Sequence, residues 1–365
     1  MGEWRRTTWG NVITLQRGFD ITKNSQALNG VIPVVSSGGV SSYHDKAMSQ
    51  GPGVIMGRKG TLGRVHYIEG PYWPHDTTLW VCNFKGNDPR FVYYALKGID
   101  PVFLNVGSAS PTLNRNHIHP LPVWWPSSTI QRAVAEVLGA LDDKIAANER
   151  LVSLSDALAE AHFEAATSEQ RAHRLPLSSL ARFINGRAFT KDATGSGRVV
   201  IRIAELNSGI GASTVYNDID VAEDNLARPG DLLFAWSGSL TVARWFRPEA
   251  IVNQHIFKVV PVEGVPVWLI NQALRARLAD FRSIAANKAT TMGHIQRRHL
   301  DEPVHVPAAD EIARLDGLMS SLWARALAAE VETLQLAATR DELLPLLMSG
   351  RLRVKDAEKV VAEVV

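Results

Sequence analysis

The feature that most constrains this chain is an internal repeat. The segment AANERLVSL at residues 146–154 aligns with AAEVETLQL at residues 328–336, an offset of 182 residues. Upstream of these, HIHPLPVWWP (residues 117–126) resembles HLDEPVHVP (residues 299–307), and each ends on a proline just before a long segment of helical periodicity. A repeated sequence predicts a repeated structure, so we expect two copies of one unit, each a globular domain followed by a long helix.

The globular parts of the repeat are expected to be rich in strands. GVIMGRKGTLGRV at residues 53–65 faces GDLLFAWSGSLTVAR at residues 230–244. Each begins with a glycine and an apolar strand, continues through a Gly/Ser turn, and closes a second strand on an arginine, Arg64 or Arg244. The two copies share this hairpin pattern, while the residues Arg-Lys at the first tip are Trp-Ser at the second.

Two segments, roughly residues 127–170 and 308–349, show the three/four apolar rhythm of long amphipathic helices. The first carries Ile130, Val134, Val137, Leu141, Ile145, Leu151, Leu154 and Leu158, and the second carries Ile312, Leu315, Leu318, Leu322, Leu327, Val331, Leu334 and Leu344. About 35 helical residues span about 50 Å, more than a compact domain needs. We therefore expect the two apolar seams to pack together as an antiparallel coiled coil, with Asn148 either fixing its register or exposed. The fold class is α+β, with two strand-rich α/β domains in tandem, separated by these two helices.

Charge alternates along the chain in step with the repeat. Lys and Arg number 12 against 7 Asp and Glu in residues 1–125, and 17 against 10 in residues 171–300. The helical segments are acidic, with 3 against 8 in residues 126–170 and 7 against 12 in residues 301–365. The net charge of +2 hides this alternation. Two basic globular blocks are what a polyanion partner requires, although a solvated surface has the same composition.

Composition excludes several classes of protein. The chain has 365 residues, 45% of them hydrophobic and 21% charged, which is ordinary for a folded protein of two or more domains. Its one cysteine, Cys82, makes no internal disulfide. No apolar run approaches the ~20 residues of a membrane span. We expect a cytoplasmic protein.

The stretch GRKGTLGR at residues 57–64 raises the alternative of a nucleotide site. A P-loop places four residues between its glycines and then Gly-Lys-Ser/Thr, whereas these glycines recur every third residue. The other reading is a tight hairpin whose glycines adopt positive φ. A two-domain nucleotide-binding or hydrolytic enzyme that uses this loop remains the alternative function.

With these residues in view, the chain resembles the DNA-specificity (S) subunit of type I restriction-modification systems. The most specific match is LPVWWPSSTIQRAVAEVLGALDDKIAANERL at residues 121–151. Within it the family pattern is matched by Gln131, Leu141, Asp142, Lys144, Ile145 and Asn148. SGRLRV at residues 349–354 resembles the family's motif after the last helix. The resemblance implies a target-recognition domain at 1–126, a conserved helix at 127–172, a second recognition domain at 173–307, a second helix at 308–349 and a tail at 350–365.

The resemblance also implies a protein without chemistry of its own. Each recognition domain would read one half of a bipartite site in double-stranded DNA. The chain would dock two methyltransferase subunits, which bind S-adenosylmethionine and methylate adenine N6, and restriction subunits where these exist. No cofactor or metal is expected in this chain, and the pair His117 and His119 is attributed to packing.

Side chains that read bases must be hydrogen-bond donors or acceptors on loops that reach the major groove. In the first domain the candidates are Arg58, Lys59, Arg64, His75, Asn114 and Arg115. In the second they are Arg187, Lys191, Trp236, Ser237, Arg244, Gln254, Lys288 and Arg297. Each of them is also explained by an ordinary solvated surface, so the choice among them requires the structure.

Overall fold

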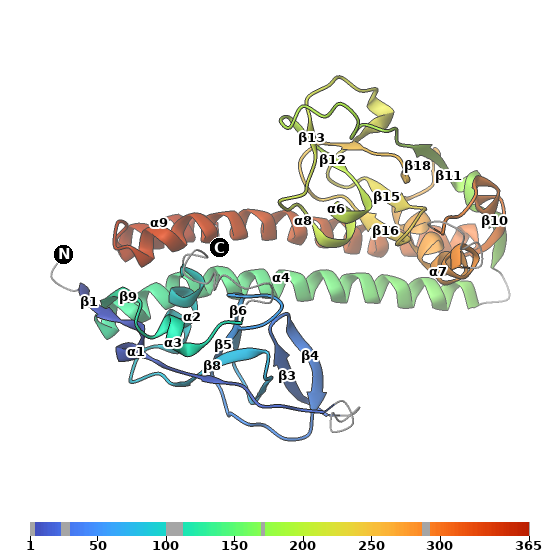
Figure 1. Cartoon of the computed structure of the whole chain (residues 1–365). Helices are drawn as coiled ribbons and strands as arrows, with labels where there is room; N and C mark the ends of the chain where they lie inside the picture. Colours follow the sequence, from blue (N-terminus) through green and yellow to red (C-terminus); the bar gives the residue numbers. More distant parts are fainter. Residues whose placement is uncertain (1–3, 23–29, 100–111, 169–171, 287–292, 365) are drawn as a thin grey trace. The chain divides into compact units, whose positions relative to one another are not determined.

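The computed structural model describes residues 4–22, 30–99, 112–168, 172–286 and 293–364. The chain divides into two compact units, one of residues 1–144 with 335–365 and the other of residues 145–334. Each unit holds one strand-rich domain and part of two long helices, α4 (Ser128–Ser168) and α8 (Ala309–Met348) (Figure 1). Both helices pass from one unit into the other, so the domain boundaries expected from the resemblance stay predictions.

The first domain is built on two sheets. One has the order β2-β8-β5-β6, from Thr14–Arg17, Thr78–Asn83, Gly53–Gly57 and Val65–Ile68. The other has the order β4-β3-β7, from Gly39–His44, Ile32–Ser36 and Trp73–Pro74. A separate ribbon joins β1 (Trp4–Thr8) to β9 (Pro122–Pro126). The helices are α1 (Trp9–Val12), α2 (Pro89–Lys97) and α3 (Arg115–Ile118).

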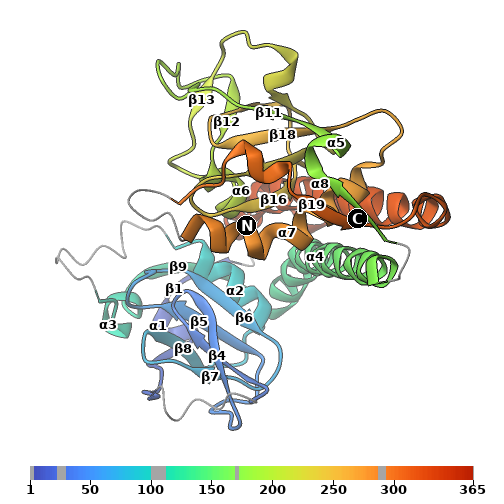
Figure 2. The same ribbon diagram turned by 90° about the vertical axis from the view of Figure 1, so that its right-hand side faces the viewer.

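The second domain repeats this plan, as Figures 1 and 2 show. Its main sheet has the order β11-β18-β15-β16, from Ala181–Asn185, Ile256–Pro261, Leu232–Ala235 and Thr241–Arg244. The other sheet is β13-β12-β17-β14, from Tyr216–Asn217, Arg198–Ile201, Ala250–Val252 and Leu226–Ala227. The ribbon pairs β10 (His173–Pro176) with β19 (Pro303–Val306). The helices are α5 (Leu177–Leu180), α6 (Ile203–Ser208), α7 (Val267–Ala286), η3 (Glu223–Asn225) and η4 (Arg297–Leu300).

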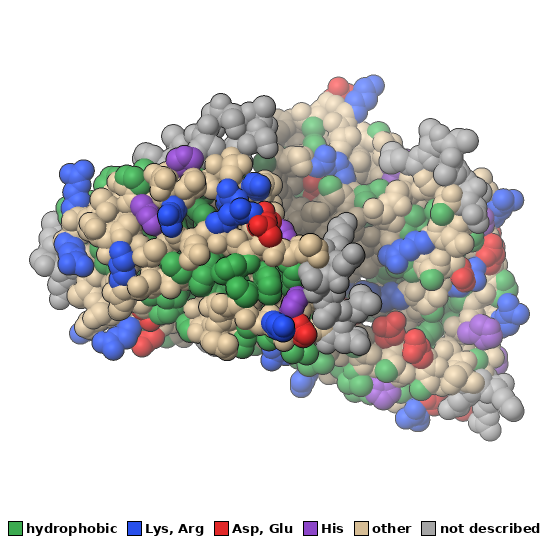
Figure 3. All heavy atoms as spheres, turned by 60° about the horizontal axis from the view of Figure 1, so that its bottom comes forward, with side chains coloured by type: hydrophobic (Ala, Val, Ile, Leu, Met, Phe, Trp, Pro, Cys, Tyr) green, Lys and Arg blue, Asp and Glu red, His purple; other side chains and the backbone are tan. Residues whose placement is uncertain are grey.

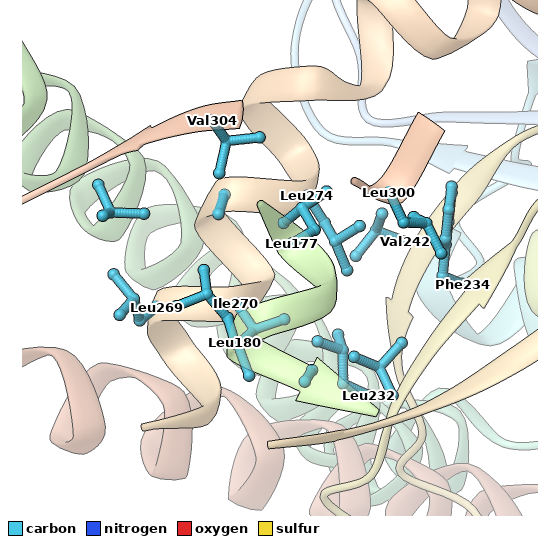
Figure 4. Packing of buried hydrophobic residues seen from close by; sticks show 14 of the residues in the cluster. Leu177, Leu180, Leu232, Phe234, Val242, Leu269, Ile270, Leu274, Leu300 and Val304 are labelled. Carbon is cyan, nitrogen blue, oxygen red and sulfur yellow. The ribbon is translucent and has the colours of Figure 1, made fainter. Parts of the chain in front are cut away.

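The main sheets of the two domains therefore have the same strand order, and the repeat expected from the sequence is confirmed. The burial of the central strands explains why the sequence could show it. All five residues of β5 and all four residues of β15 are buried, so both read as continuous apolar runs. The hydrophobic cluster of the second domain joins β15 to α7. Leu269, Ile270 and Leu274 of α7 lie among Leu177 and Leu180 of α5 (Figure 4).

The two long helices run antiparallel within each unit. In the first unit Arg340 Nη1 of α8 donates to Asp142 Oδ1 of α4 at 2.8 Å. In the second unit Asn148 Nδ2 of α4 donates to Glu332 Oε2 of α8 at 2.7 Å. Residue numbers that fall on one helix as they rise on the other define an antiparallel pair, as predicted. Asn148 is 5% exposed, so the polar seam residue is buried rather than on the surface.

The residues after α8 form part of the first unit. Gly350 has φ +69° and lies against Trp4, so a side chain there would meet the indole ring. Helix α9 (Val354–Ala362) then buries Ala357 and Val361. No helix in the described part of the chain is long and apolar enough to cross a membrane.

Candidate nucleic-acid interface

Backbone pairing identifies which residues of the two domains are equivalent. The first equivalent positions lie at the ends of β2 and β11, the first strands of the two main sheets. Phe19 forms an isolated parallel bridge with His75, and Arg187 forms the same bridge with Asn253. The glycines just before Phe19 and Arg187 permit this close approach. A Cβ on Gly18 would lie 2.2 Å from the His75 carbonyl oxygen, and one on Gly186 would lie 2.1 Å from that of Asn253. Only glycine fits either position.

The hairpin position that follows β5 or β15 corresponds in the same way. The amide of Arg58 donates to the Thr77 carbonyl at 2.9 Å, and the amide of Trp236 donates to the His255 carbonyl at 3.1 Å. Arg58 in the first domain thus stands where Trp236 stands in the second. The pairing of the two tips that the sequence alignment proposed is confirmed here.

A capped turn supplies the third pair of corresponding positions. The amide of Asn114 donates to His117 Nδ1 at 3.2 Å, and the amide of Gln296 donates to His299 Nδ1 at 2.9 Å. Each imidazole closes the first turn of a short helix by accepting an otherwise unsatisfied N–H. The residues that follow the two caps are Arg115 and Arg297.

In the first domain these three positions open onto one cavity of about 430 Å³. It is lined by Gln16, Arg17, Gly18, Phe19, Arg58, Leu79, Asn114 and Arg115. Three candidates from the sequence, Arg58, Asn114 and Arg115, are thereby brought together across 57 residues of chain. Sequence reasoning missed Gln16 and Arg17, although aligning QRGF at residues 16–19 with INGR at residues 184–187 would have indicated them.

Arg58 occupies this cavity with a fixed side chain. Its Nε donates to the Leu113 carbonyl at 3.3 Å and its Nη1 to the Asp76 carbonyl at 3.2 Å. Both partners are neutral, and Arg58 has no ion pair among the described residues. Arg17, by contrast, pairs with Asp20 at 2.7 Å and with Asp76 at 3.2 Å.

In the second domain the corresponding position carries an indole ring packed among neighbours. The Trp236 ring centroid lies 5.1 Å from that of His255, 5.7 Å from that of Phe257 and 6.2 Å from that of His294. Its Nε1 donates to Asn185 Oδ1 at 2.9 Å. Trp236 is therefore partly buried, and only part of its surface faces outward.

The candidate cations fall into two groups, those with a carboxylate partner in the part of the chain that the structure describes and those without one. Figure 3 shows one face of the molecule, on which several Lys and Arg side chains have an Asp or Glu beside them. Within the described residues, the following candidates have no carboxylate partner: Arg58, Lys59, Arg64, Arg115, Arg187, Lys191 and Arg297. All but the half-buried Arg58 are exposed, which leaves their charge free for an anionic ligand.

Arg244 differs from these cations. It is 7% exposed, its Nε donates to Glu330 Oε2 of α8 at 2.7 Å, and its guanidinium lies 4.6 Å from the centre of the Trp323 ring. These contacts hold the second domain to α8. The expected match of Arg244 with Arg64 is wrong, because strand pairing sets Arg64 opposite Gly57 and Arg244 opposite Leu232, three residues further from the tip.

The other candidates have mixed surroundings. Ser237 is 4% exposed and forms a bridge with His294, so its hydroxyl is covered. His75 is held by its own loop, with Nδ1 3.0 Å from Thr77 Oγ1. Gln254 is exposed in the corresponding loop of the second domain. Lys288 lies outside the described residues.

Both histidines of the pair accept hydrogen bonds from backbone amides. His117 Nδ1 accepts the Asn114 amide, and His119 Nε2 accepts the Leu15 amide at 3.0 Å. Burial, and then the positive charge of Arg115 and Lys85, lowers the pKa of His119, which favours the neutral acceptor. No cluster of three potential metal ligands occurs among the residues that the structure describes.

Comparison with known proteins defines the class of this fold. The crystal structure of a type I restriction-modification S subunit from M. genitalium has a TM-score of 0.65 with this chain, at 16% identity, over 94% of this chain and 96% of that one. The chain therefore has the fold of a type I S subunit.

The sequence comparison is consistent with that class. Residues 1–153 match the family described as the type I restriction modification DNA specificity domain. The resemblance drawn from residues 121–151 is thus confirmed. No curated protein matches the chain significantly.

Two further structures match with lower scores. The HsdS subunit from Thermoanaerobacter tengcongensis has a TM-score of 0.35 at 14% identity, over 96% of this chain and 97% of that one. A structure described as the basis of complex assembly and conformational transition of the type I R-M system has a TM-score of 0.36 at 15% identity, over 96% and 98%. Scores at this level support no conclusion about this chain.

Proposed function

We propose that this chain is the DNA-specificity subunit of a type I restriction-modification complex, and that each domain reads one half of a bipartite site in double-stranded DNA. The single observation that carries the proposal is that the two domains make the same hydrogen bonds from backbone amides at equivalent positions. These bonds set Arg58, Asn114 and Arg115 in one domain and Trp236, Gln296 and Arg297 in the other at the same backbone positions. One scaffold with different side chains at its reading positions suits two half-sites of different sequence.

The chain acts without catalysis of its own under this proposal. Two methyltransferase subunits, one per repeat, supply S-adenosylmethionine and transfer its methyl group to adenine N6, and restriction subunits join where they exist. Two like surfaces on a duplicated chain favour two like partners. Native mass spectrometry of the co-expressed complex is expected to show two methyltransferase copies, and a single copy at saturation would contradict this stoichiometry.

The alternative is an enzyme that uses residues 57–64 as a nucleotide site. The loop is the hairpin between β5 and β6, in which the Gly57 amide donates to the Arg64 carbonyl at 2.8 Å and the Gly63 amide to the Gly57 carbonyl at 3.0 Å. A strand follows it rather than a helix, so it lacks the helix N-terminus on which a P-loop binds phosphate. Nucleotide turnover that co-purifies with the chain and disappears in Lys59→Ala would support the enzyme instead.

Methylome sequencing of the host tests the main proposal directly. Deleting this gene is expected to abolish adenine methylation at one bipartite motif while other motifs stay methylated. A plasmid copy is expected to restore it. If the motif persists after deletion, the chain does not specify it.

A further inference from the structure

The two domains differ most in chemistry at the hairpin position held by Arg58 and Trp236. In the first domain the space between Arg58, Arg17 and Leu79 is part of the open cavity. In the second, Asn185 and Phe257 hold the places of Arg17 and Leu79, and Trp236 contacts both of them. The indole thus occupies space that stays open in the first domain.

Arg58 keeps guanidinium N–H groups that no acceptor in the described part of the protein uses, which indicates a ligand with hydrogen-bond acceptors. A guanidinium carries five N–H groups, and the Leu113 and Asp76 carbonyls use two of them. Three remain, on a side chain whose orientation those two bonds have already fixed. A pre-oriented arginine loses little further entropy on binding, and its planar fork matches a pair of acceptors.

Two further arginines line the cavity: Arg17, whose charge is paired with Asp20 and Asp76, and the exposed Arg115. The remaining lining favours a base over a phosphate, because Gln16 and Asn114 contribute amides and Phe19 and Leu79 contribute apolar surface. Such a mixture complements the edge of a base. A backbone phosphate is better served by the exposed cations nearby, such as Lys59.

We propose that Arg58 reads a guanine in the half-site of the first domain, donating to N7 and O6, and that Trp236 closes the corresponding place in the second domain. Guanine is the base that presents two acceptors side by side in the major groove. This inference rests on the proposed function and specifies one contact within it. The two half-sites then differ, with an arginine-dependent guanine in one and no contact of that kind in the other.

The test uses the full chain, co-expressed with its methyltransferase subunits and selected on a randomised DNA duplex library. Arg58→Gln and Arg58→Lys are compared with Lys46→Gln, which removes an exposed charge of the same domain that does not line the cavity. Both Arg58 variants are expected to lose about tenfold in guanine preference at one position, within the range of one bidentate contact. The base preference at the other positions and in the second half-site is expected to stay unchanged, and the Lys46→Gln control is expected to keep the wild-type preference throughout.

Each other outcome overturns the inference. Uniform weakening without a change in base preference, rescued by Arg58→Lys, means a phosphate contact. A change in the second half-site means that the domains do not read independently. If the wild-type complex enriches no bipartite sequence at all, the proposed function itself fails, which is distinguishable from failure of Arg58 alone.

A probe on the DNA side removes any ambiguity from misfolded variants. In wild-type complex, 7-deazaguanine at the proposed guanine removes the N7 acceptor and keeps Watson–Crick pairing. We expect weaker binding at that position, by less than the loss in the Arg58 variants because only one of the two hydrogen bonds is removed, and none of this effect at guanines outside the motif. Unchanged binding contradicts the contact at N7.

Discussion

Among single residues, the structure separates cations that bind within the protein from cations that remain available. Arg244 illustrates the first kind. It is buried between Glu330, Asp156 at 3.6 Å and the ring of Trp323. Arg115 and Lys59 illustrate the second kind, because they are exposed and have no ion pair within the described residues. A sequence shows all three only as basic residues near a turn or a strand end.

Replacing Arg244 by Met is expected to destabilise the fold by roughly 2–3 kcal/mol, less than for a fully buried pair, because it leaves the partly buried Glu330 carboxylate without its partner. Urea unfolding near neutral pH measures this. Adding Glu330→Leu is expected to recover most of the loss, since no charge then remains buried. A single variant as stable as wild type would contradict the role given to the pair.

The same variant should show a specific dependence on pH. Burial raises the pKa of Glu330 above its ordinary value, and Arg244 opposes that shift. Without Arg244 the pKa in the folded state rises further, so the folded protein binds a proton more readily than the unfolded chain does. Stability is then lost as pH rises from the unfolded pKa through the folded one. We expect the loss in free energy of unfolding caused by Arg244→Met to be smallest at about pH 4 and largest near neutrality. Adding Glu330→Leu should remove this pH dependence.

Among the secondary-structure elements, the start of α4 is tied to the first domain by the side chain of Gln131. Gln131 is 2% exposed. Its Nε2 donates to Asn87 Oδ1 at 2.9 Å and to the Pro126 carbonyl at 3.0 Å, while its Oε1 accepts the Asp88 amide at 3.1 Å. These bonds explain physically why a glutamine stands at this place in the motif that carried the resemblance.

Replacing Gln131 by Leu is expected to cost about 3 kcal/mol, at about 1 kcal/mol for each of its three hydrogen bonds, one of them buried and two partly buried. The midpoint of thermal unfolding measures it. Arg132→Leu, at the exposed neighbouring position, is the matched control and should change little. Equal effects of the two substitutions would show that the bonds of Gln131 contribute nothing.

For the molecule as a whole, the proposal makes the two half-sites independent. Gln296→Ala is expected to alter base preference only in the half read by the second domain, and Lys59→Ala only the half read by the first or the overall affinity. Distant positions without shared contacts have additive effects. Methylation mapping of the single and double variants decides this, and a Lys59 change that alters the other half would contradict it.

The gap between the half-sites should follow the length of the helices. Inserting four residues after Glu149 in α4, with four more after Val331 in α8, keeps Asn148 and Glu332 on facing segments and adds about 6 Å. At about 3.4 Å per base pair, the unspecified gap is expected to lengthen by one or two base pairs while both halves stay unchanged. A variant complex that is folded and still methylates the original gap would contradict a spacer role for the helices.

The repeat, the two long helices and the strand-rich domains all follow from the amino-acid sequence alone. Those features depend on local periodicity: 3.6 residues along α4 and α8, and buried apolar runs in β5 and β15. Local patterns also placed Arg58 and Trp236 at corresponding hairpin tips. The candidate site was only partly visible, because a basic residue on a turn has the same local pattern whether it reads DNA or meets solvent.

Which of these residues meet depends on the tertiary structure. The cavity brings together three segments that are far apart in sequence: Gln16 and Arg17, Arg58, and Asn114 and Arg115. Long-range backbone hydrogen bonds hold them, such as the one from the Leu113 amide to the Arg58 carbonyl at 2.9 Å. The burial of Arg244 depends on Glu330, 86 residues away along the chain. Long-range contacts of this kind arise from packing rather than from periodicity, so the chain's local pattern could not distinguish the arginine that stabilises the fold from the arginine that is free to bind.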